Sequence, residues 1–290
     1  MNNLINKSSV FGARRLIMAI SAWQVHRNKE RAAPNQRAPK QEIEKAGKTA
    51  MNIVMLAHTR RIFDADLQDL ARMVAEMGGF AERQISQAIE ALRKRNIRLA
   101  HQIIDRDATL DVFQAKIEAK SIDIIAQRQP LAIDLREIIS ALRISNDLER
   151  IGDLAKNIGK RVIAIGDEIL PMSIIHGLEH MTRLVMEQFK TALDSFAAKD
   201  VTAALAVRNG DLQIDALNNA LFYEVLLYMG EDPHNIATCT QMLFCIKNLE
   251  RIGDHATNIA EAVHYIISGR PLSSERPKGN NTSFAAALQA

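Results

Sequence analysis

The chain lacks the residues that build several large classes of protein. Only two cysteines occur in 290 residues, which excludes a disulfide-rich secreted fold and suits a reducing compartment. Aromatic residues make up only 4%, so the aromatic and β-branched alternation typical of sandwiches and barrels is missing. No apolar run approaches the ~20 residues that a membrane-spanning helix needs. We therefore expect a cytoplasmic protein without a transmembrane segment.

Net positive charge is confined to one end of the chain. Residues 1–50 hold ten Lys and Arg against three Glu, a net +7, so the other 240 residues carry −4 of the total of +3. A nucleic-acid-binding protein needs a basic face on its folded part, so no nucleic-acid partner is expected. We interpret residues 1–54 as a basic, disordered N-terminal extension, or as sequence upstream of a translation start at Met51 or Met55.

What remains is a helix-forming composition with regular apolar spacing. From Ile62 onward, apolar residues recur at intervals of three and four, which is the period of an amphipathic helix. Prolines, glycines and polar breaks divide the pattern at short intervals. The six predicted helices are 62–93, 97–127, 131–165, 172–197, 200–229 and 234–268. Short breaks between long helices imply antiparallel neighbours, so the predicted fold class is all-α.

The chain also repeats itself. The string Leu-Glu-Arg-Ile-Gly-Asp occurs at 148–153 and again at 249–254, and each copy is followed by Asn-Ile after three residues. Chance is a poor explanation for an identical string of six residues near the ends of two long helices. We infer two tandem, homologous three-helix bundles, at residues 55–167 and 168–269, followed by a tail at 270–290.

Acidic pairs accompany the repeat on neighbouring helices. Glu and Asp four residues apart share one face of a helix. Asp111 lies 18 residues before the turn at Gln129 and Glu149 lies 20 after it, so both stand roughly 27–30 Å from that turn. The second repeat gives similar heights. We therefore predict one carboxylate cluster in each bundle. The residues are Asp107, Asp111, Glu149 and Asp153 in the first, and Asp211, Asp215, Glu250 and Asp254 in the second.

Two interpretations of these clusters remain open on the residues alone. Carboxylates gathered in one groove repel unless a cation lies between them, and all-oxygen ligation suits Mg, Ca, Mn or iron. The alternative is a solvated acidic face, because Glu149 and Asp153 point away from the apolar stripe of their helix and Arg150 could pair with them. The intervening Gly152 costs ~1 kcal/mol in a helix relative to Ala, which indicates close approach of another element.

Other motifs give weaker signals. His176 and His180 have a spacing that zinc could use, but they lack matched partners. Glu261 and His264 supply only one of the two Glu-x-x-His motifs that a di-iron bundle needs. No Gly-rich phosphate loop and no Ser, His and Asp ordering of a hydrolase occurs. No catalytic residue is predicted, and the protein is not expected to be an enzyme.

At these residues the chain resembles the PhoU family of phosphate-signalling regulators, over roughly residues 55–270. The similarity is carried by both Glu-Arg-Ile-Gly-Asp strings and by three further segments. These are His58-Thr59-Arg60-Arg61-Ile62-Phe63-Asp64, Met77-Gly78-Gly79, and Arg128-Gln129-Pro130 with Asp134-Leu135-Arg136. The resemblance implies two three-helix bundles with pseudo-twofold symmetry. It also implies iron or divalent metal ions, with Fe, Mn, Mg and Zn as candidates, bound through Glu149, Asp153, Glu250 and Asp254.

The resemblance further implies a negative regulator of phosphate uptake and of phosphate-starvation signalling. Such a protein is an adaptor between the ATPase subunit of the phosphate ABC transporter and a sensor histidine kinase, and it meets the membrane only indirectly. A second copy of the chain, as a homodimer, is a further candidate partner. The competing hypothesis is a carboxylate-bridged metal-binding bundle with metal-storage or oxidase-like activity.

Overall fold

The computed structural model describes residues 40–168 and 171–272. The chain divides into two units, residues 1–60 and residues 61–290. Helix α2, Lys40–Lys94, begins well before the predicted start at Ile62, so residues 40–54, which we expected to be disordered, are helical. The reason is local: no proline occurs between Pro39 and Pro130, and Ala, Glu, Lys and Met dominate the stretch after Pro39. The predicted disorder of residues 1–39 and the predicted tail beyond residue 272 lie outside the described residues.

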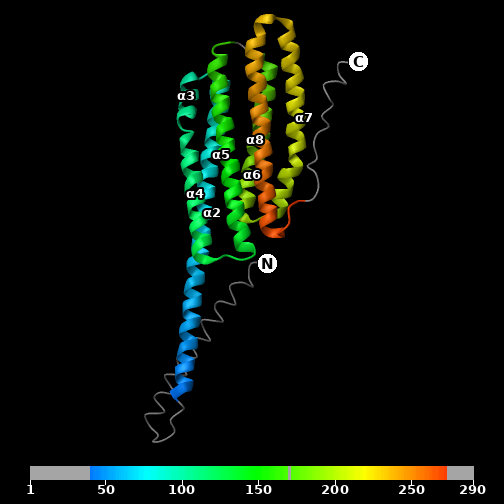
Figure 1. Ribbon diagram of the computed structural model, residues 1–290. Coiled ribbons are helices and arrows are strands. Elements are labelled where there is room, and N and C mark those ends of the chain that lie inside the picture. Colours follow the sequence, from blue (N-terminus) through cyan, green and yellow to red (C-terminus); the bar gives the residue numbers. More distant parts are fainter. Residues whose placement is uncertain (1–39, 169–170, 273–290) are drawn as a thin grey trace. The chain divides into compact units, whose positions relative to one another are not determined.

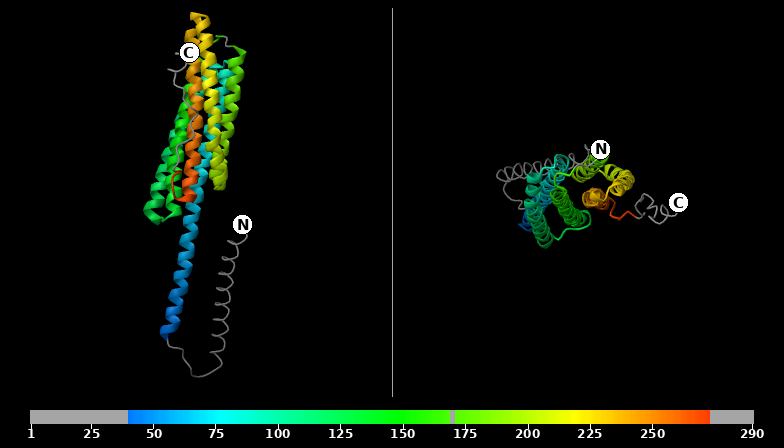
Figure 2. Two further views of the ribbon diagram at one scale, coloured as in Figure 1. Left: turned by 90° about the vertical axis from the view of Figure 1, so that its right-hand side faces the viewer. Right: turned by 90° about the horizontal axis from the view of Figure 1, so that it is seen from above.

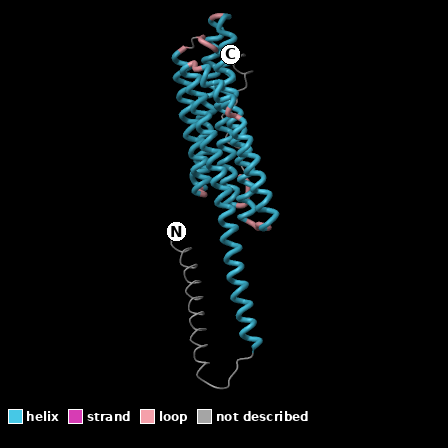
Figure 3. The backbone as a smooth tube through the Cα atoms, turned by 90° about the vertical axis from the view of Figure 1, so that its left-hand side faces the viewer, coloured by secondary structure: helices cyan, strands magenta, loops and turns pink. Residues whose placement is uncertain are grey.

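Helices also form nearly all of the described part of the second unit, which contains no strand (Figures 1 and 3). This confirms the all-α fold and the six long helices, with the second of them divided in two. After α2 come α3 (Ile97–Asp105), α4 (Ala108–Arg128), α5 (Ile133–Ile165), α6 (Met172–Ala198), α7 (Val201–Glu231), the short η1 (Pro233–Asn235) and α8 (Ile236–Ser268). No helix among the described residues is long and apolar enough to cross a membrane.

The helix ends follow from local chemistry. Helix α4 ends at Arg128, because the next residue, Gln129, adopts a left-handed conformation (φ 49°) directly before Pro130. Helix α7 begins after Asp200, whose carboxylate accepts hydrogen bonds from the backbone amides of Thr202 and Ala203 at 2.8 and 3.1 Å. These turns reverse the chain and place α4 beside α5, and α6 beside α7.

The two bundles share one hydrophobic core. On α5 the predicted apolar stripe is fully buried, from Ile144 through Ile151 to Ile158. The stripe on α8 repeats it, from Cys245 through Ile252 to Ile259. Both helices contribute to a single continuous cluster of buried residues, so the predicted repeats are packed into one compact unit rather than into two separate ones.

Helices α5 and α8 pack against each other in opposite directions (Figure 2). Arg136 near the start of α5 donates a hydrogen bond to the carbonyl of Ile266 near the end of α8, at 3.2 Å. Arg161 near the end of α5 reaches Gln241 near the start of α8, at 2.9 Å. The two Glu-Arg-Ile-Gly-Asp strings therefore lie level at the middle of this contact.

A polar pair lies on one side of the contact between α5 and α8. The buried Asp147 of α5 accepts a hydrogen bond from Asn258 at 3.0 Å and lies 2.8 Å from Nδ1 of His255, both on α8. By the repeat offset of 101 residues, the position of His255 corresponds to Leu154 on α5 and that of Asp147 to Asn248 on α8. The two sides of the contact therefore differ chemically although the helices are homologous.

Candidate carboxylate clusters

The first cluster lies where α4 begins beside the middle of α5. The division of the predicted helix 97–127 falls at Arg106 and Asp107, so Asp107 precedes the first turn of α4 and Asp111 lies in that turn. Helix α5 contributes Glu149 and Asp153, whose side chains are 16% and 30% exposed. The alternative of a fully solvated acidic face therefore does not describe these two carboxylates, because both are partly covered.

Glycine explains why the carboxylates are covered. A Cβ atom added to Gly152 would lie 2.1 Å from Cδ1 of Leu110 on α4 and 3.0 Å from Oε1 of Gln84 on α2. A Cβ added to Gly253 would lie 3.2 Å from both Cδ1 of Ile214 and Oε1 of Gln188. Absence of a side chain at both positions lets the neighbouring helices approach closely, as predicted from the sequence.

An ammonium group lies inside the first cluster. Nζ of Lys156, one turn after Asp153 on α5, hydrogen bonds to Asp107 and, at 2.6 Å, to Asp153. Partial burial alone would lower the pKa of Lys156, but the bonds to these two carboxylates raise it above its ordinary value. Arg150 lies further out, 3.4 Å from Glu149 and 3.6 Å from Asp153. The first cluster therefore already contains a cation that belongs to the chain.

The environment of Glu149 raises its pKa. Burial raises this pKa, and the negative charge of Asp153 adds to the shift. The charges of Asp111 and Asp107 on α4 also contribute. Of the four predicted residues of the first bundle, Asp107 and Asp153 share the ammonium of Lys156, and Asp111 and Glu149 lie near enough for their charges to interact.

The second cluster is built on α7 and α8. Burial raises the pKa of Glu250, and the charges of Asp254 and Asp215 raise it further, against the opposing effect of Lys247. Oε1 of Glu250 accepts a hydrogen bond from Lys247 at 2.7 Å. Its Oε2 is buried and makes no hydrogen bond within the described part of the chain. The fourth residue, Asp211, is buried and accepts a hydrogen bond from Gln188 at 3.2 Å.

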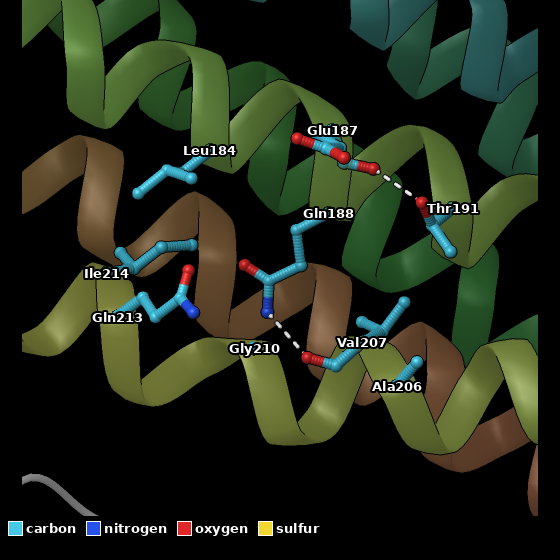
Figure 4. Close-up of a pocket in the computed structure, with 9 residues that line it drawn as sticks. All are labelled: Leu184, Glu187, Gln188, Thr191, Ala206, Val207, Gly210, Gln213 and Ile214. Atoms are coloured by element: carbon cyan, nitrogen blue, oxygen red, sulfur yellow. Dashed lines mark hydrogen bonds between the residues drawn. The ribbon is translucent and has the colours of Figure 1, made fainter.

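Two buried glutamines lie against the glycines of the two Glu-Arg-Ile-Gly-Asp strings, and the sequence analysis missed them. Gln188 is 7% exposed and donates from Nε2 to the carbonyl of Val207, to Asp211 and to Thr257, at 3.2, 3.2 and 2.9 Å. It borders a cavity of about 240 Å³ between α6 and α7, which Figure 4 shows with Gln188 at its centre. Gln84 lies 104 residues earlier, the same offset that relates Asp107 to Asp211. That shared offset was the available signal.

The donor set suits a hard cation, but the side chains are not arranged for one. Every predicted residue offers carboxylate oxygen, and the buried Oε2 of Glu250 lacks a hydrogen-bond donor. Within the described residues, however, no three His, Cys, Asp or Glu side chains are grouped closely enough to hold a metal ion. In the first cluster Lys156 separates Asp107 from Asp153. Metal binding therefore stays a prediction, and it would require these side chains to turn.

The weaker candidate motifs are occupied or apart. His176 and His180 are exposed on α6. Glu261 lies 3.6 Å from Arg208, and His264 lies 3.2 Å from the hydroxyl of Ser268. The histidine pair and the single Glu-x-x-His therefore gain no support as metal sites.

The fold and the repeated sequence define a class of protein: an all-α tandem repeat of three-helix bundles, with the Glu-Arg-Ile-Gly-Asp string in each repeat. A family model described as the PhoU domain matches the chain twice, at residues 74–162 and 178–263. The chain belongs to the PhoU family.

Individual relatives agree with that assignment over nearly their whole length. A Rhizobium meliloti protein named phosphate-specific transport system accessory protein PhoU homolog is 47% identical over 227 residues, covering 78% of this chain and 96% of the relative. The Caulobacter vibrioides protein of the same name is 45% identical over 225 residues, covering 77% and 97%.

Two solved structures share the fold. The crystal structure of PhoU from Pseudomonas aeruginosa is 36% identical, with a TM-score of 0.68 over 72% of this chain and 100% of that one. The phosphate transport system regulatory protein PhoU from Streptococcus pneumoniae is 28% identical, with a TM-score of 0.69 over 73% and 100%.

Proposed function

We propose that this chain is a regulator of phosphate transport that restrains phosphate uptake and phosphate-starvation signalling when phosphate is plentiful. The observation that carries the proposal is the 47% identity to a phosphate-specific transport system accessory protein, over 96% of that protein's length. The regulator acts through contacts with other proteins and has no catalytic step of its own.

The proposed mode of action is that of an adaptor. One partner is the ATPase subunit of the phosphate ABC transporter, at the cytoplasmic side of the membrane, and the other is a sensor histidine kinase. Two similar bundles give the chain two related surfaces. Helix α4 exposes Val112 and Ile122, which are 51% and 57% exposed, and α7 exposes Leu227, which is 73% exposed. Contacts that favour one conformation of the kinase over another would shift its activity.

Divalent metal or iron binding by the two carboxylate clusters is part of the same proposal. Oxygen ligands would come from Asp107, Asp111, Glu149 and Asp153 in the first cluster, and from Asp211, Asp215, Glu250 and Asp254 in the second. A bound cation would neutralise the mutual repulsion that contributes to the raised pKa values of Glu149 and Glu250. The chemical role of the ion is to fix the relative positions of the helices that carry it.

The test uses a bacterial strain that lacks its own PhoU-family protein. The full chain should restore repression of a phosphate-starvation reporter at high phosphate, and it should retain the transporter ATPase subunit and the kinase in a pull-down. Ile122→Asp on α4 should weaken repression without unfolding the protein, because Ile122 is 57% exposed. Its control, Asp123→Asn, changes the exposed neighbouring residue on the same helix.

Failure of the full chain to restore repression would contradict the regulatory role. Iron-dependent oxidase turnover by the purified protein would instead support the competing metal-bundle hypothesis.

A further inference from the structure

The second bundle contains a small cavity between α6 and α7 (Figure 4). Its apolar lining comes from Leu184 on α6 and from the buried Val207 and Ile214 on α7. Its polar lining includes Gln188 and Glu187 on α6. The volume of about 240 Å³ is below the roughly 300–1,000 Å³ of pockets that take whole small molecules, so the cavity has the size for a single side chain.

A glycine opens the α7 side of this cavity. A Cβ atom added to Gly210 would meet no atom within 4 Å, whereas one added to Gly152 or Gly253 would meet neighbouring helices. Glycine weakens a helix relative to alanine, and no contact among the described residues requires it at position 210. A backbone without a side chain lets a bound group approach closely. Gly210 therefore leaves room for a group that comes from outside the chain.

Gln188 offers this cavity a buried acceptor without a donor. The side chain is 7% exposed, and its Nε2 donates to the Val207 carbonyl, to Asp211 and to Thr257. These three acceptors fix the orientation of the carboxamide and leave Oε1 on the side of Ile214, as Figure 4 shows. Oε1 makes no hydrogen bond within the described residues. Because buried polar atoms are nearly always hydrogen bonded, this oxygen indicates a missing donor.

Glu187 gives the cavity a negative charge. It precedes Gln188 on α6, is exposed, and is the charged residue of the cavity lining. No cation of the described part of the chain forms an ion pair with its carboxylate. A donor that carries positive charge would therefore find a carboxylate at the edge of the cavity and a carbonyl oxygen inside it.

The corresponding place in the first bundle holds larger side chains. The offset of 104 residues pairs Leu184 with Phe80 and Glu187 with Arg83. The ring of Phe80 packs against Phe113 on α4, with the centroids 6.2 Å apart, and the guanidinium of Arg83 lies 5.3 Å from the centroid of Phe80. The first bundle thus supplies its own ring and guanidinium where the second has a smaller side chain and a carboxylate.

We propose that the cavity between α6 and α7 receives an arginine side chain of a partner protein. The inference rests on the proposed adaptor role. The aliphatic part of the arginine lies against Leu184 and Ile214, and its guanidinium donates to Oε1 of Gln188 and to the carboxylate of Glu187. Arginine suits the site better than lysine, because a guanidinium has five N–H donors in a fixed plane and can serve two separate acceptors.

The probe for the site is N-butylguanidinium, which reproduces the arginine side chain, added to the full isotope-labelled chain. Nuclear magnetic resonance should show saturable shifts of the Gly210 backbone amide and of the Gln188 side-chain amide. Pentanamide, a neutral molecule of similar length, should bind about tenfold more weakly because it lacks the charge. Absence of these shifts, or equal binding of pentanamide, would overturn the proposal.

Three variants locate the binding. Glu187→Gln keeps the shape of the cavity and should weaken binding of N-butylguanidinium about fivefold, and unchanged binding would overturn the proposal. Leu184→Phe introduces the ring that the first bundle carries and should abolish binding. Asp194→Asn is the matched control, because it removes the same charge from an exposed position two turns further along α6. Circular dichroism checks folding, and Glu187→Gln carries the test if Leu184→Phe does not fold, since Glu187 is exposed.

Pull-downs separate this inference from the adaptor role. The wild type should retain both the transporter ATPase subunit and the kinase, and Leu184→Phe and Glu187→Gln should each lose one of them. Retention of both partners by both variants would overturn the partner as the source of the arginine and leave the adaptor role standing. Failure of the wild type to retain either partner would overturn both proposals, even if N-butylguanidinium binds.

Discussion

Gly152→Ala and Gly253→Ala are the same substitution at the same place in the two repeats, yet they should differ in their effect on stability. The Cβ atom would lie 2.1 Å from Cδ1 of Leu110 in the first case, and no closer than 3.2 Å to any atom in the second. Leu110 is 1% exposed, so its side chain has to repack within the core to make room for the added Cβ. Forced overpacking of a core typically costs about 1–3 kcal/mol.

Helix propensity acts in the opposite direction at both positions. Replacing glycine by alanine inside a helix contributes about 1 kcal/mol. At Gly253 this gain should dominate, because contacts at 3.2 Å require only small adjustments. Gly253→Ala is therefore expected to be neutral or up to about 1 kcal/mol more stable, whereas Gly152→Ala should lose about 1 kcal/mol net.

Urea unfolding followed by circular dichroism measures the difference between the two variants. Metal-free buffer keeps ion binding out of the comparison. If the slope of the unfolding free energy against urea concentration is unchanged, the urea concentration at the unfolding midpoint should fall for Gly152→Ala. For Gly253→Ala it should stay the same or rise. Equal stabilisation of both variants would refute the conclusion that Gly152 is required for the close approach of α4.

Three further outcomes are expected in unfolding and labelling experiments. Asp66→Asn should cost about 1–2 kcal/mol at neutral pH, because Asp66 is bound by Lys120 at 2.8 Å. That bond lowers the pKa of Asp66 in the folded state. The Asp66 carboxylate therefore stabilises the wild-type protein above the ordinary carboxyl pKa, and this stabilisation is lost as the pH falls below it. An identical acid-unfolding transition in Asp66→Asn would contradict this. Asp147→Ala should lower the free energy of unfolding by about 1–3 kcal/mol, because His255 loses its buried partner. Thermal unfolding would show this as a lower midpoint temperature. Burial raises the pKa of Cys245 to about 12, so its thiol should resist a disulfide reagent at pH 8 until urea unfolds the protein, and rapid labelling of the native protein would contradict that.

The fold was largely predictable because its signals are local. Apolar periodicity identified the long helices, and breaks such as Gln129-Pro130 identified the turns that end them. The repeated string then indicated two homologous bundles. Local signals are weakest where a helix is interrupted without proline, and so the break at Arg106 and Asp107 was missed, while the start of α2 at Lys40 was placed too late.

The sequence predicted which carboxylates to compare, but it could not predict their surroundings, and their role as a site stays a prediction. Heights above a turn placed Asp111 level with Glu149, because helical rise is constant. Helical rise could not predict the solvent exposure of Glu149 and Asp153, because that exposure depends on how closely α4 approaches Gly152. The contacts of Lys156 could not be predicted from the sequence either. A lysine three residues after an aspartate on a helix is most often part of a surface ion pair, and only the folded structure shows that Lys156 also binds Asp107.

The homology of α5 and α8 creates a problem of partner choice while the chain folds. Each chain carries nearly the same apolar stripe on α5 and on α8. Two chains that fold close together therefore present four similar stripes, and α5 of one chain could pair with α5 of the other. In that mispaired contact Asp147 would face Leu154 in place of His255, which leaves a buried carboxylate without its partner at a cost of about 3–5 kcal/mol. The correct contact between α5 and α8 pairs it. We expect divergence at these two repeat-related pairs of positions to favour the contact within one chain and to disfavour exchange between chains.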